Sequence, residues 1–377
     1  KLQYAYPSNP KTSYLTWETI ATWNIGLDMS FLNSRLNFTG DYFIRDTEGM
    51  LAKSYVLPSV FGAKEPKENC ADLRTKGWEL SLNWNDSFAL MGKRFNYTVS
   101  ASLGDNKTVI TKYNNPEKLL TDYYEGMVLG EIWGYRVDGL FTSDEEATEY
   151  TSKINQDFVN ARILSDKVDP YYRAGDLKFR DLDNNNVINK GDDTVYDPGD
   201  REIIGNETPR YNYSFRLGAD WNGFDLGIFF QGVGKRDWYP NHLSTGFWGP
   251  YSRAFTSFIP ENFMDQCWSE ENPGGYFPRF RGYQTFKDSQ LGVNNDRYLQ
   301  NASYIRLKNL TVGYTLPVLK KVFTKLRVYF TGENLWYWSP MKKYTKYIDP
   351  EAAGGNGNTG MAYNYSRNFS VGVDITF

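Results

Sequence analysis

The stretch that decides the fold is 368-NFSVGVDITF-377. Its odd-numbered residues, from Phe369 to Phe377, are apolar, whereas its even-numbered residues, from Asn368 to Thr376, are polar or glycine. A period of two places these sets on opposite faces of an extended strand. The stretch therefore predicts a β-strand with one apolar and one polar face.

The same alternation recurs along the chain and predicts about ten strands in all. The clearest further examples are 23-WNIGLDMSF-31, 78-WELSLNW-84, 95-FNYTVSASL-103, 211-YNYSFRLGADW-221, 224-FDLGIFFQG-232 and 305-IRLKNLTVGYTL-316. In the last of these the phase slips near Asn309, which predicts a β-bulge. A single helix is expected, over residues 143–154.

The connections between these strands are of two kinds. Tight turns are predicted at Asn33–Ser34 and Asn222–Gly223, and the connections 86–94 and 316–325 are also short. Long loops are predicted near residues 53–75, 139–209, 236–298 and 337–366. Between Tyr211 and Phe377 short and long connections alternate along the chain. Because successive antiparallel strands are joined at opposite ends, the short turns lie at one end of the strands and the long loops at the other. This asymmetry is typical of outer-membrane β-barrels, whereas long structureless loops are rare in compact soluble domains.

Composition limits the class of protein. The chain has 377 residues, of which 40% are hydrophobic and 17% aromatic, with 29 Tyr and 11 Trp. The net charge of −3 and the lack of a basic block argue against nucleic acid as a partner. No apolar run approaches the ~18 residues of a membrane helix. The mean hydropathy of −0.59 resembles that of a soluble protein, but this average does not detect barrel strands.

Two architectures fit an alternating strand. In a soluble β-sandwich the apolar face packs on a second sheet and is rich in Val, Ile and Leu. In a transmembrane barrel it meets lipid, carries aromatic belts, and leaves a polar face toward an aqueous lumen. Here the apolar faces are rich in Trp, Tyr and Phe, and the polar faces carry Asp28, Asp41, Arg45, Glu79, Arg216, Asp220 and Asp225. We therefore predict an all-β fold, a transmembrane antiparallel β-barrel, with the sandwich as the alternative.

Nearly the whole chain resembles the C-terminal part of SusC/RagA-type TonB-dependent transporters of the Bacteroidetes outer membrane. Eight stretches carry the resemblance in family order: 15-LTWETIATWNIGLDMSFLNSRLNFTGDYFIRDTEGML-51, 77-GWELSLNW-84, 132-IWGYRVDGLF-141, 175-GDLKFRDLDNNNVINKGDD-193, 203-IIGNETPRYNYSFRLGADWNGFDLGIFFQG-232, 301-NASYIRLKNLTVGYTLP-317, 326-LRVYFTGENLWYWS-339 and 369-FSVGVDITF-377. The resemblance implies a 22-stranded barrel closed around an N-terminal plug. It also implies a SusD-like surface lipoprotein and the TonB complex as partners, and import of an oligosaccharide or a peptide.

About ten strands cannot close such a barrel, and no plug-like segment is found. We therefore expect residues 1–377 to be the C-terminal part of a longer polypeptide. The start, 1-KLQYAYPSNP-10, has neither Met nor an apolar leader, so a signal has been removed or more chain precedes it. The resemblance also makes Phe377 similar to the terminal aromatic that the barrel-assembly machinery recognises; a membrane-girdle role is the alternative, and both can hold.

The sharpest local motif is 181-DLDNNNVINKGDD-193, whose spacing matches a calcium loop with oxygen ligands at positions 1, 3, 5, 7, 9 and 12. The predicted ligands are Asp181, Asp183, Asn185, the carbonyl of Val187, Asn189 directly or through water, and Asp192. Calcium fits because it is a hard ion that takes six to eight oxygens from a flexible turn.

Two positions depart from the usual calcium loop. Asn186 replaces the turn glycine, although Asn tolerates positive φ, and Asp192 replaces the bidentate Glu. Ile188 would be the apolar anchor. The alternative is a polar Asx-rich turn without an ion. We expect a structural calcium ion that stiffens a long loop; the sequence leaves open on which side of the membrane it lies.

The loop 236–298 is rich in aromatic residues and Arg, which suits stacking on sugars or gripping peptide side chains. The candidates for substrate contact are Trp238, Tyr239, Trp248 and Tyr251. The alternative for each ring is packing against the others to hold the loop shut. The loop also contains the only histidine, His242, for which we expect a loop hydrogen bond.

Catalysis is poorly supported, because one histidine gives a catalytic triad or a histidine-rich zinc site almost nothing to build from. Two carboxylates would suffice for a glycosidase, but no spacing indicates such a pair.

Cys70 and Cys267 could pair only in an oxidising compartment. The predicted function is transport, with a secreted calcium-stabilised glycan-binding β-sandwich and a passive porin as alternatives. The cargo is not revealed.

Overall fold

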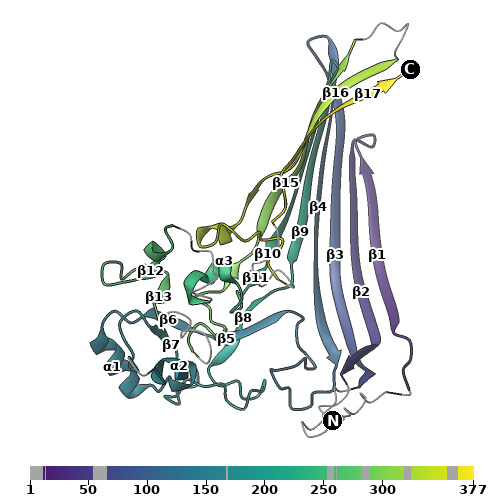
Figure 1. Ribbon diagram of the computed structural model, residues 1–377. Coiled ribbons are helices and arrows are strands. Elements are labelled where there is room, and N and C mark those ends of the chain that lie inside the picture. The colour runs from purple at the N-terminus through teal and green to yellow at the C-terminus, as the bar shows by residue number, and fades with distance from the viewer. Residues whose placement is uncertain are drawn as a thin grey trace, which may run out of the picture.

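A computed structural model describes residues 12, 14–53, 66–166, 169–252, 259, 261–281, 289–317, 324–354 and 364–377. These residues form one large antiparallel sheet and a group of loops beside one end of it (Figure 1). Within the described ranges the sheet has nine strands: β1 (Thr19–Phe31), β2 (Leu36–Lys53), β3 (Lys67–Leu90), β4 (Lys93–Lys112), β9 (Arg210–Trp221), β10 (Phe224–Lys235), β15 (Tyr304–Leu316), β16 (Lys325–Trp338) and β17 (Asn368–Thr376). The predicted all-β antiparallel fold is confirmed.

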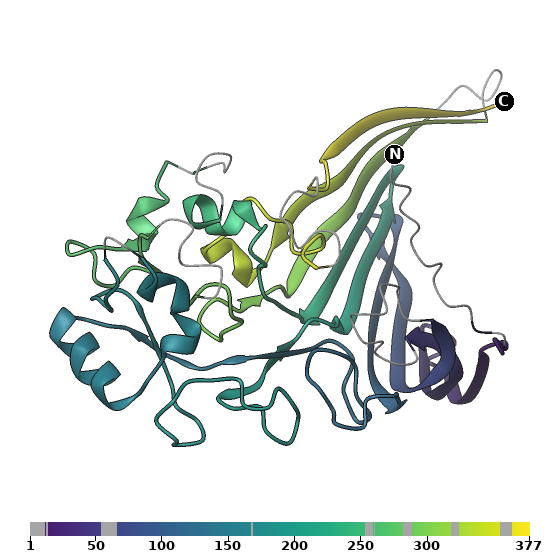
Figure 2. The ribbon, with the colours of Figure 1, turned by 60° about the horizontal axis from the view of Figure 1, so that its bottom comes forward.

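The strands follow one another in sequence order, so the sheet is an up-and-down meander in which β4 pairs directly with β9. In Figure 2 they trace a curved path from the purple β1–β2 hairpin to the yellow-green strands near the C-terminus. The sequence left open how many strands lie between Leu103 and Tyr211. In the described part of the chain, no strand of the large sheet lies between β4 and β9. Residues 113–209 leave and return at the same end.

The register keeps the apolar residues on one face. Val371 lies opposite Phe330, Phe330 opposite Val312, and Val312 opposite Leu226, across four neighbouring strands. Directly opposed residues of antiparallel strands point to the same side. This face is bare: Val371 is 76% exposed and Trp23 is 56% exposed.

No second sheet covers the apolar face, because the other sheets found in the described part of the chain have only two strands each. The β-sandwich alternative is therefore wrong for this chain, since a sandwich would bury these rings between its layers. Aromatic residues gather where the strands meet the short turns: Phe88 packs on Phe95 at 5.1 Å and Phe224 on Tyr314 at 4.5 Å between ring centroids.

The turn predicted at Asn33–Ser34 lies within the four residues between Phe31 and Leu36, whereas the middle of the connection predicted over 316–325 lies outside the described residues. Asn222 and Gly223, with φ of 50° and 89°, form a two-residue turn between Trp221 and Phe224, as a type I′ hairpin requires. The connection expected over 86–94 is shorter, because the strands run to Leu90 and restart at Lys93. The bulge is confirmed, since the register of β15 slips between Leu307 and Asn309.

The long connections all lie at the other end of the sheet. The first is shorter than the predicted 53–75, because β3 already begins at Lys67. The connections also hold short strands: β5 (Glu131–Tyr135), β6 (Val137–Leu140), β7 (Leu177–Phe179), β8 (Arg201–Asn206), β11 (Asp237–Trp238), β12 (Cys267–Trp268), β13 (Phe277–Arg279) and β14 (Gln300–Asn301).

The predicted helix is confirmed as α1 (Asp144–Lys153), which Ser143 caps by accepting a hydrogen bond of 3.1 Å from the amide of Glu146. Single turns of helix occur at α2 (Ala161–Leu164), at α3 (Thr245–Trp248), and as 3₁₀ turns at Asp157–Val159, Gly249–Tyr251, Met264–Gln266 and Pro340–Lys343. None of the helices in the described ranges has the length and apolar character needed to cross a bilayer.

Candidate functional site: the rim module

We call the described parts of residues 113–209, 236–303 and 339–354 the rim module. Its aromatic and aliphatic core draws on all three connections; examples are Phe179 from the first, Trp248 and Phe277 from the second, and Met341 from the third, each at most 1% exposed. Since one shared core needs all three, the connections form a single packed unit rather than separate loops.

Two of the predicted substrate contacts, Trp248 and Tyr251, are fully buried in this core. The Trp248 indole N–H donates to the carbonyl of Pro240 at 3.0 Å, and the Tyr251 hydroxyl donates to the carbonyl of Pro278 at 2.6 Å. Both rings therefore hold the module together instead of facing a cargo. The cause is long-range packing, in which Phe277 contacts both rings, and no local pattern reveals it.

The other two predicted contacts, Trp238 and Tyr239, line a hollow of about 500 Å³. Trp238 is almost completely buried, whereas Tyr239 is half-buried. His242 lines the same hollow, and its carbonyl accepts a hydrogen bond from the hydroxyl of Ser252. Sequence reasoning missed Trp133, which lies on β5 far from these residues in the chain and borders the same hollow.

A buried ion pair joins two of the connections. The carboxylate of Asp176, which is completely buried, accepts bonds from Arg281 Nε at 2.9 Å and Nη2 at 2.8 Å. Gln290 Nε2 donates to the same carboxylate at 3.2 Å. A bidentate Arg–carboxylate pair fixes the relative position of the two segments as well as their charge.

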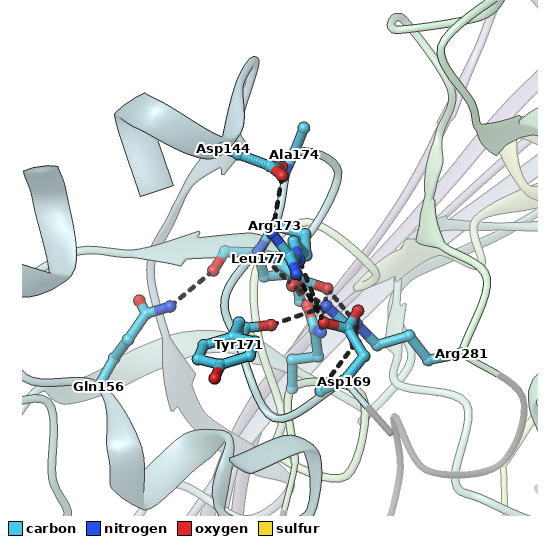
Figure 3. Close-up of polar contacts among 10 residues, drawn as sticks. Asp144, Gln156, Asp169, Tyr171, Arg173, Ala174, Leu177 and Arg281 are labelled. Atoms are coloured by element: carbon cyan, nitrogen blue, oxygen red, sulfur yellow. Dashed lines mark hydrogen bonds and ion pairs between the residues drawn. The ribbon is translucent and has the colours of Figure 1, made fainter. Parts of the chain in front are cut away.

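The pair is part of a wider network. Figure 3 shows Arg173 between Asp144 and Asp169, with Arg281 beside Asp169. The amide of Ala174 donates to Asp144 at 2.8 Å and, together with Arg173, holds the pKa of that carboxyl below its usual range. We call this network, from Asp144 to Arg281, the polar clamp; it ties the N-terminus of α1 to the second connection.

The third connection is tied to the sheet. Arg306, on the polar side of β15 and 1% exposed, forms ion pairs with Asp349 and, at 3.1 Å, with Glu351. Its guanidinium lies 4.7 Å from the ring centroid of Tyr337 on β16. The residues after β16 therefore fold back over the polar face of the sheet near its long-loop end.

The predicted calcium loop is a compact turn. Asn184 and Asn186 have positive φ, of 60° and 65°, so Asn186 takes the conformation for which calcium loops use glycine. Ile188 is completely buried, and its amide donates to the carbonyl of Asn155 at 2.7 Å. The anchor expected at position 8 is therefore in place.

The carboxylates of this loop gather around a different third member. Oxygens of Asp181, Asp183 and Asp200 lie within 4.8 Å of one another, whereas Asp192, expected at position 12, is not in the group. The amide of Asp192 instead donates to Asp197 at 3.2 Å. Asp200 was missed because it follows Asp193, the last residue of the motif, by seven positions and comes close to the motif only through the fold.

No ion pair to a Lys or Arg is found for these three carboxylates in the described residues. Asp200 is completely buried, and this burial raises the pKa of its carboxyl. Among the residues that the structure describes, its oxygens accept only from the amides of Leu182 and Asn189, at 2.8 Å each. One oxygen of Asp181 is buried and accepts no hydrogen bond. The chemistry of the donor set, which is oxygen throughout, fits a hard divalent cation.

The polar face of the sheet carries charge pairs between strands. Arg327 on β16 binds Asp225 on β10 at 2.9 and 2.7 Å and Asp374 on β17 at 3.0 Å.

Phe377 follows β17 and is 83% exposed, and its role in barrel assembly stays a prediction. Cys70 on β3 and Cys267 in the rim module are both free thiols, so they do not pair.

A curved meander with a bare apolar face, an ion-paired polar face and all long connections at one end defines a segment of an outer-membrane β-barrel. The family model described as "TonB dependent receptor-like, beta-barrel" matches residues 2–335. The chain belongs to this family, whose SusC and RagA members are outer-membrane proteins.

Curated relatives agree with this assignment. TonB-dependent receptor P26 of Formosa agariphila is 27% identical over 98% of this chain and 35% of its own length. TonB-dependent receptor SusC of Bacteroides thetaiotaomicron is 24% identical over 99% of this chain and 34% of its own length. The chain thus spans about a third of the length of these relatives.

Among solved structures, the RagAB peptide transporter matches with a TM-score of 0.68 at 22% identity, over 96% of this chain and 36% of that chain. The RagAB peptide importer in the "open-open" state matches with a TM-score of 0.65 and the same identity. At this identity the likeness establishes the fold, and the resemblance to SusC/RagA-type barrels is confirmed at that level.

Proposed function

We propose that the protein imports a bulky nutrient, an oligosaccharide or a peptide, across the bacterial outer membrane in a TonB-dependent manner. The observation that carries the proposal is the sheet, whose apolar face is bare. The family to which the chain belongs consists of receptors and transporters. One relative is named SusC and one structural neighbour is a peptide importer, which supports import as the activity. Transport rather than bond breaking is the proposed chemistry.

A SusD-like surface lipoprotein is the proposed partner. RagAB is named as a two-component importer, and the rim module would lie at the mouth of the barrel, where such a lipoprotein would cover it. The TonB complex would act through regions outside this chain. Outer-membrane lipid would cover the apolar face.

Gene disruption in the producing bacterium tests import. The strain is grown on single oligosaccharides and on defined peptides as the limiting nutrient, and growth is compared with that of a complemented strain. We expect loss of growth on one nutrient class only, and co-purification of a surface lipoprotein with the tagged transporter. Unchanged growth and uptake on every nutrient tested would contradict the proposal.

We also propose that the rim module holds a structural calcium ion, through Asp181, Asp183 and Asp200, with Asn185, the carbonyl of Val187 and Asn189 as further oxygen donors. In the loop as described, Asn185 Nδ2 donates to Asp183 at 2.8 Å and Asn189 Nδ2 to the Val187 carbonyl at 3.0 Å. A bound cation would replace these two donors and neutralise the buried Asp200.

Calcium addition and chelation on the detergent-solubilised transporter test this site. We expect calcium to slow proteolysis of residues 181–200, and expect Asp200→Asn to abolish that protection. Asp192→Asn is the matched control and should behave as the wild type. Equal protection in the wild type with and without calcium would refute the site.

A further inference from the structure

We propose that the rim module contains a binding groove for an uncharged oligosaccharide, with Trp133 as the platform on which a sugar ring stacks. The inference rests on the proposed import function and narrows its cargo. It starts from two hollows in the module, of about 500 Å³ and about 280 Å³. Each is of the order of known ligand sites.

The two hollows are neighbours, and we treat them together as one binding surface, which we call the rim groove. Both are lined by the same four residues, Trp133, Arg201, Gly292 and Asn294. Tyr239 and His242 line the larger hollow, and Phe158, 45% exposed, lines the smaller. A depression that continues past a central aromatic residue suits a chain of repeating units better than a single compact ligand.

The central position of Trp133 is fixed by the backbone around it. Trp133 lies on β5, opposite Ile203 of β8, and its carbonyl accepts from Asn294 Nδ2 at 3.1 Å. Its neighbour Gly134 lets the segment around Asn294 approach, since a Cβ there would lie 2.7 Å from the Asn294 carbonyl oxygen. The half-buried indole is therefore held between the two hollows.

The lining of the rim groove contains polar groups of several kinds. Glu131 accepts from the Tyr124 hydroxyl at 2.6 Å and from the Val128 amide at 2.9 Å, which orients its carboxylate. The side chains of Glu207 and His242 have no hydrogen bond or ion pair to the described residues. Carboxylate, imidazole and amide groups together offer donors and acceptors, and sugar hydroxyl groups donate and accept at once.

The charges in the rim groove oppose an anionic cargo. The cations Lys190 and Arg201 are both paired with Asp193, at 3.2 and 2.6 Å, and so leave little free positive charge for an anion. The carboxylates of Glu131 and Glu207 would repel one. An uncharged chain avoids this repulsion.

A peptide is disfavoured by the strand edges. Extended peptides bind by adding a strand to a free sheet edge. β5 is already paired on both sides: β8 takes one edge, and the amide of Tyr135 donates to the Asn294 carbonyl at 2.9 Å on the other. β5 therefore does not offer a peptide the backbone hydrogen bonds that give such complexes their affinity.

The test uses the full-length transporter, purified from outer membranes in detergent, and isothermal titration calorimetry. The probes are hexasaccharides of glucose, mannose, galactose and xylose, a sulfated and a uronic-acid hexasaccharide, and a tryptic peptide digest. We expect at least one neutral hexasaccharide to bind, and expect Trp133→Ala to raise its Kd at least tenfold. Trp133→Phe should retain part of the affinity, and His242→Ala and Glu207→Gln should each weaken binding severalfold.

Tyr196→Ala is the matched control, because Tyr196 is 73% exposed on the same module and lines neither hollow. It should bind as the wild type does, and heat-modifiable migration on gels confirms that each variant is folded. Binding only of charged probes or peptides, binding of none of the probes, or wild-type affinity in folded Trp133→Ala would overturn the proposal. Wild-type affinity of folded Trp133→Ala, together with unchanged growth on the nutrient, would refute the groove while leaving import intact.

Discussion

At the scale of single residues, the rim module depends on a few buried charges that are fully paired. Asp176 and Arg281 are 105 positions apart in the sequence, lie in two different connections, and form a bidentate pair. Buried pairs of this kind contribute position more than net stability, because desolvation opposes the attraction. Replacing both residues of such a pair with apolar residues changes the stability little, whereas removing one of them leaves the other charge buried and unpaired, which lowers the stability strongly.

Arg281→Ala should therefore destabilise the rim module by about 3–5 kcal/mol, because it leaves the Asp176 carboxylate buried without a counter-charge. Limited proteolysis of the purified transporter against denaturant measures this. Arg180→Ala is the control: its partner is Asp138 and the pair is largely exposed, so about 0–1 kcal/mol is expected. Equal losses in the two variants would contradict the role of the polar clamp.

Acid should loosen the start of α1. Lys178 at 2.8 Å and the hydroxyl and amide of Thr142 bind the Glu146 carboxylate and lower its pKa to about 2. A depressed pKa in the folded state gives stability that is present above the unfolded value of 4.5 and is lost as the pH falls toward 2.

Hydrogen exchange of the α1 amides between pH 5 and 2, corrected for intrinsic rates, measures this loosening. In Glu146→Gln the protection should be lower at pH 5 and nearly independent of pH. Protection that falls equally in both proteins would assign the effect to other carboxylates.

At the scale of elements, each strand of the sheet must satisfy two different environments. On β3, Leu82 is opposite Phe38 and Ala101 on the apolar face, whereas Ser81 is opposite Thr39 and Ser102 on the polar face. The alternation has a period of two, so neighbouring positions in one strand differ completely in the cost of a charge.

Leu82→Arg should cost about 2–4 kcal/mol if its position is near the bilayer midplane, because a charge on the lipid face of a barrel is poorly solvated. Ser81→Arg, one residue away and facing the lumen, should be tolerated. The fraction of protein that assembles into heat-modifiable barrels in outer membranes measures both. Similar assembly of the two variants would contradict the assignment of the faces.

At the scale of the whole molecule, the described strands expose a continuous apolar surface that water cannot cover at low cost. The full-length protein should therefore be extracted from membranes only with detergent. It should also migrate differently on gels before and after boiling, because barrels resist SDS until they are heated. Extraction in salt or carbonate, with migration that boiling does not change, would contradict a transmembrane barrel.

The sequence by itself determined the local features. The period of two decided which residues of Phe369–Phe377 share a face, Asn222–Gly223 marked a tight turn, and the helix expected over residues 143–154 is α1. Each of these features depends on residues close together in the chain or on a pattern that repeats along it. Such patterns can be recognised in the sequence without coordinates.

Only the tertiary structure decided the contents of the rim module. It replaced Asp192 with Asp200 in the carboxylate group, buried Trp248 and Tyr251, and placed Trp133 and Tyr239 in the lining of one hollow. These outcomes depend on how three long connections pack on one another. The energy of such packing comes from contacts between residues far apart in the chain, and a single sequence carries no periodic signal of which distant residues will meet.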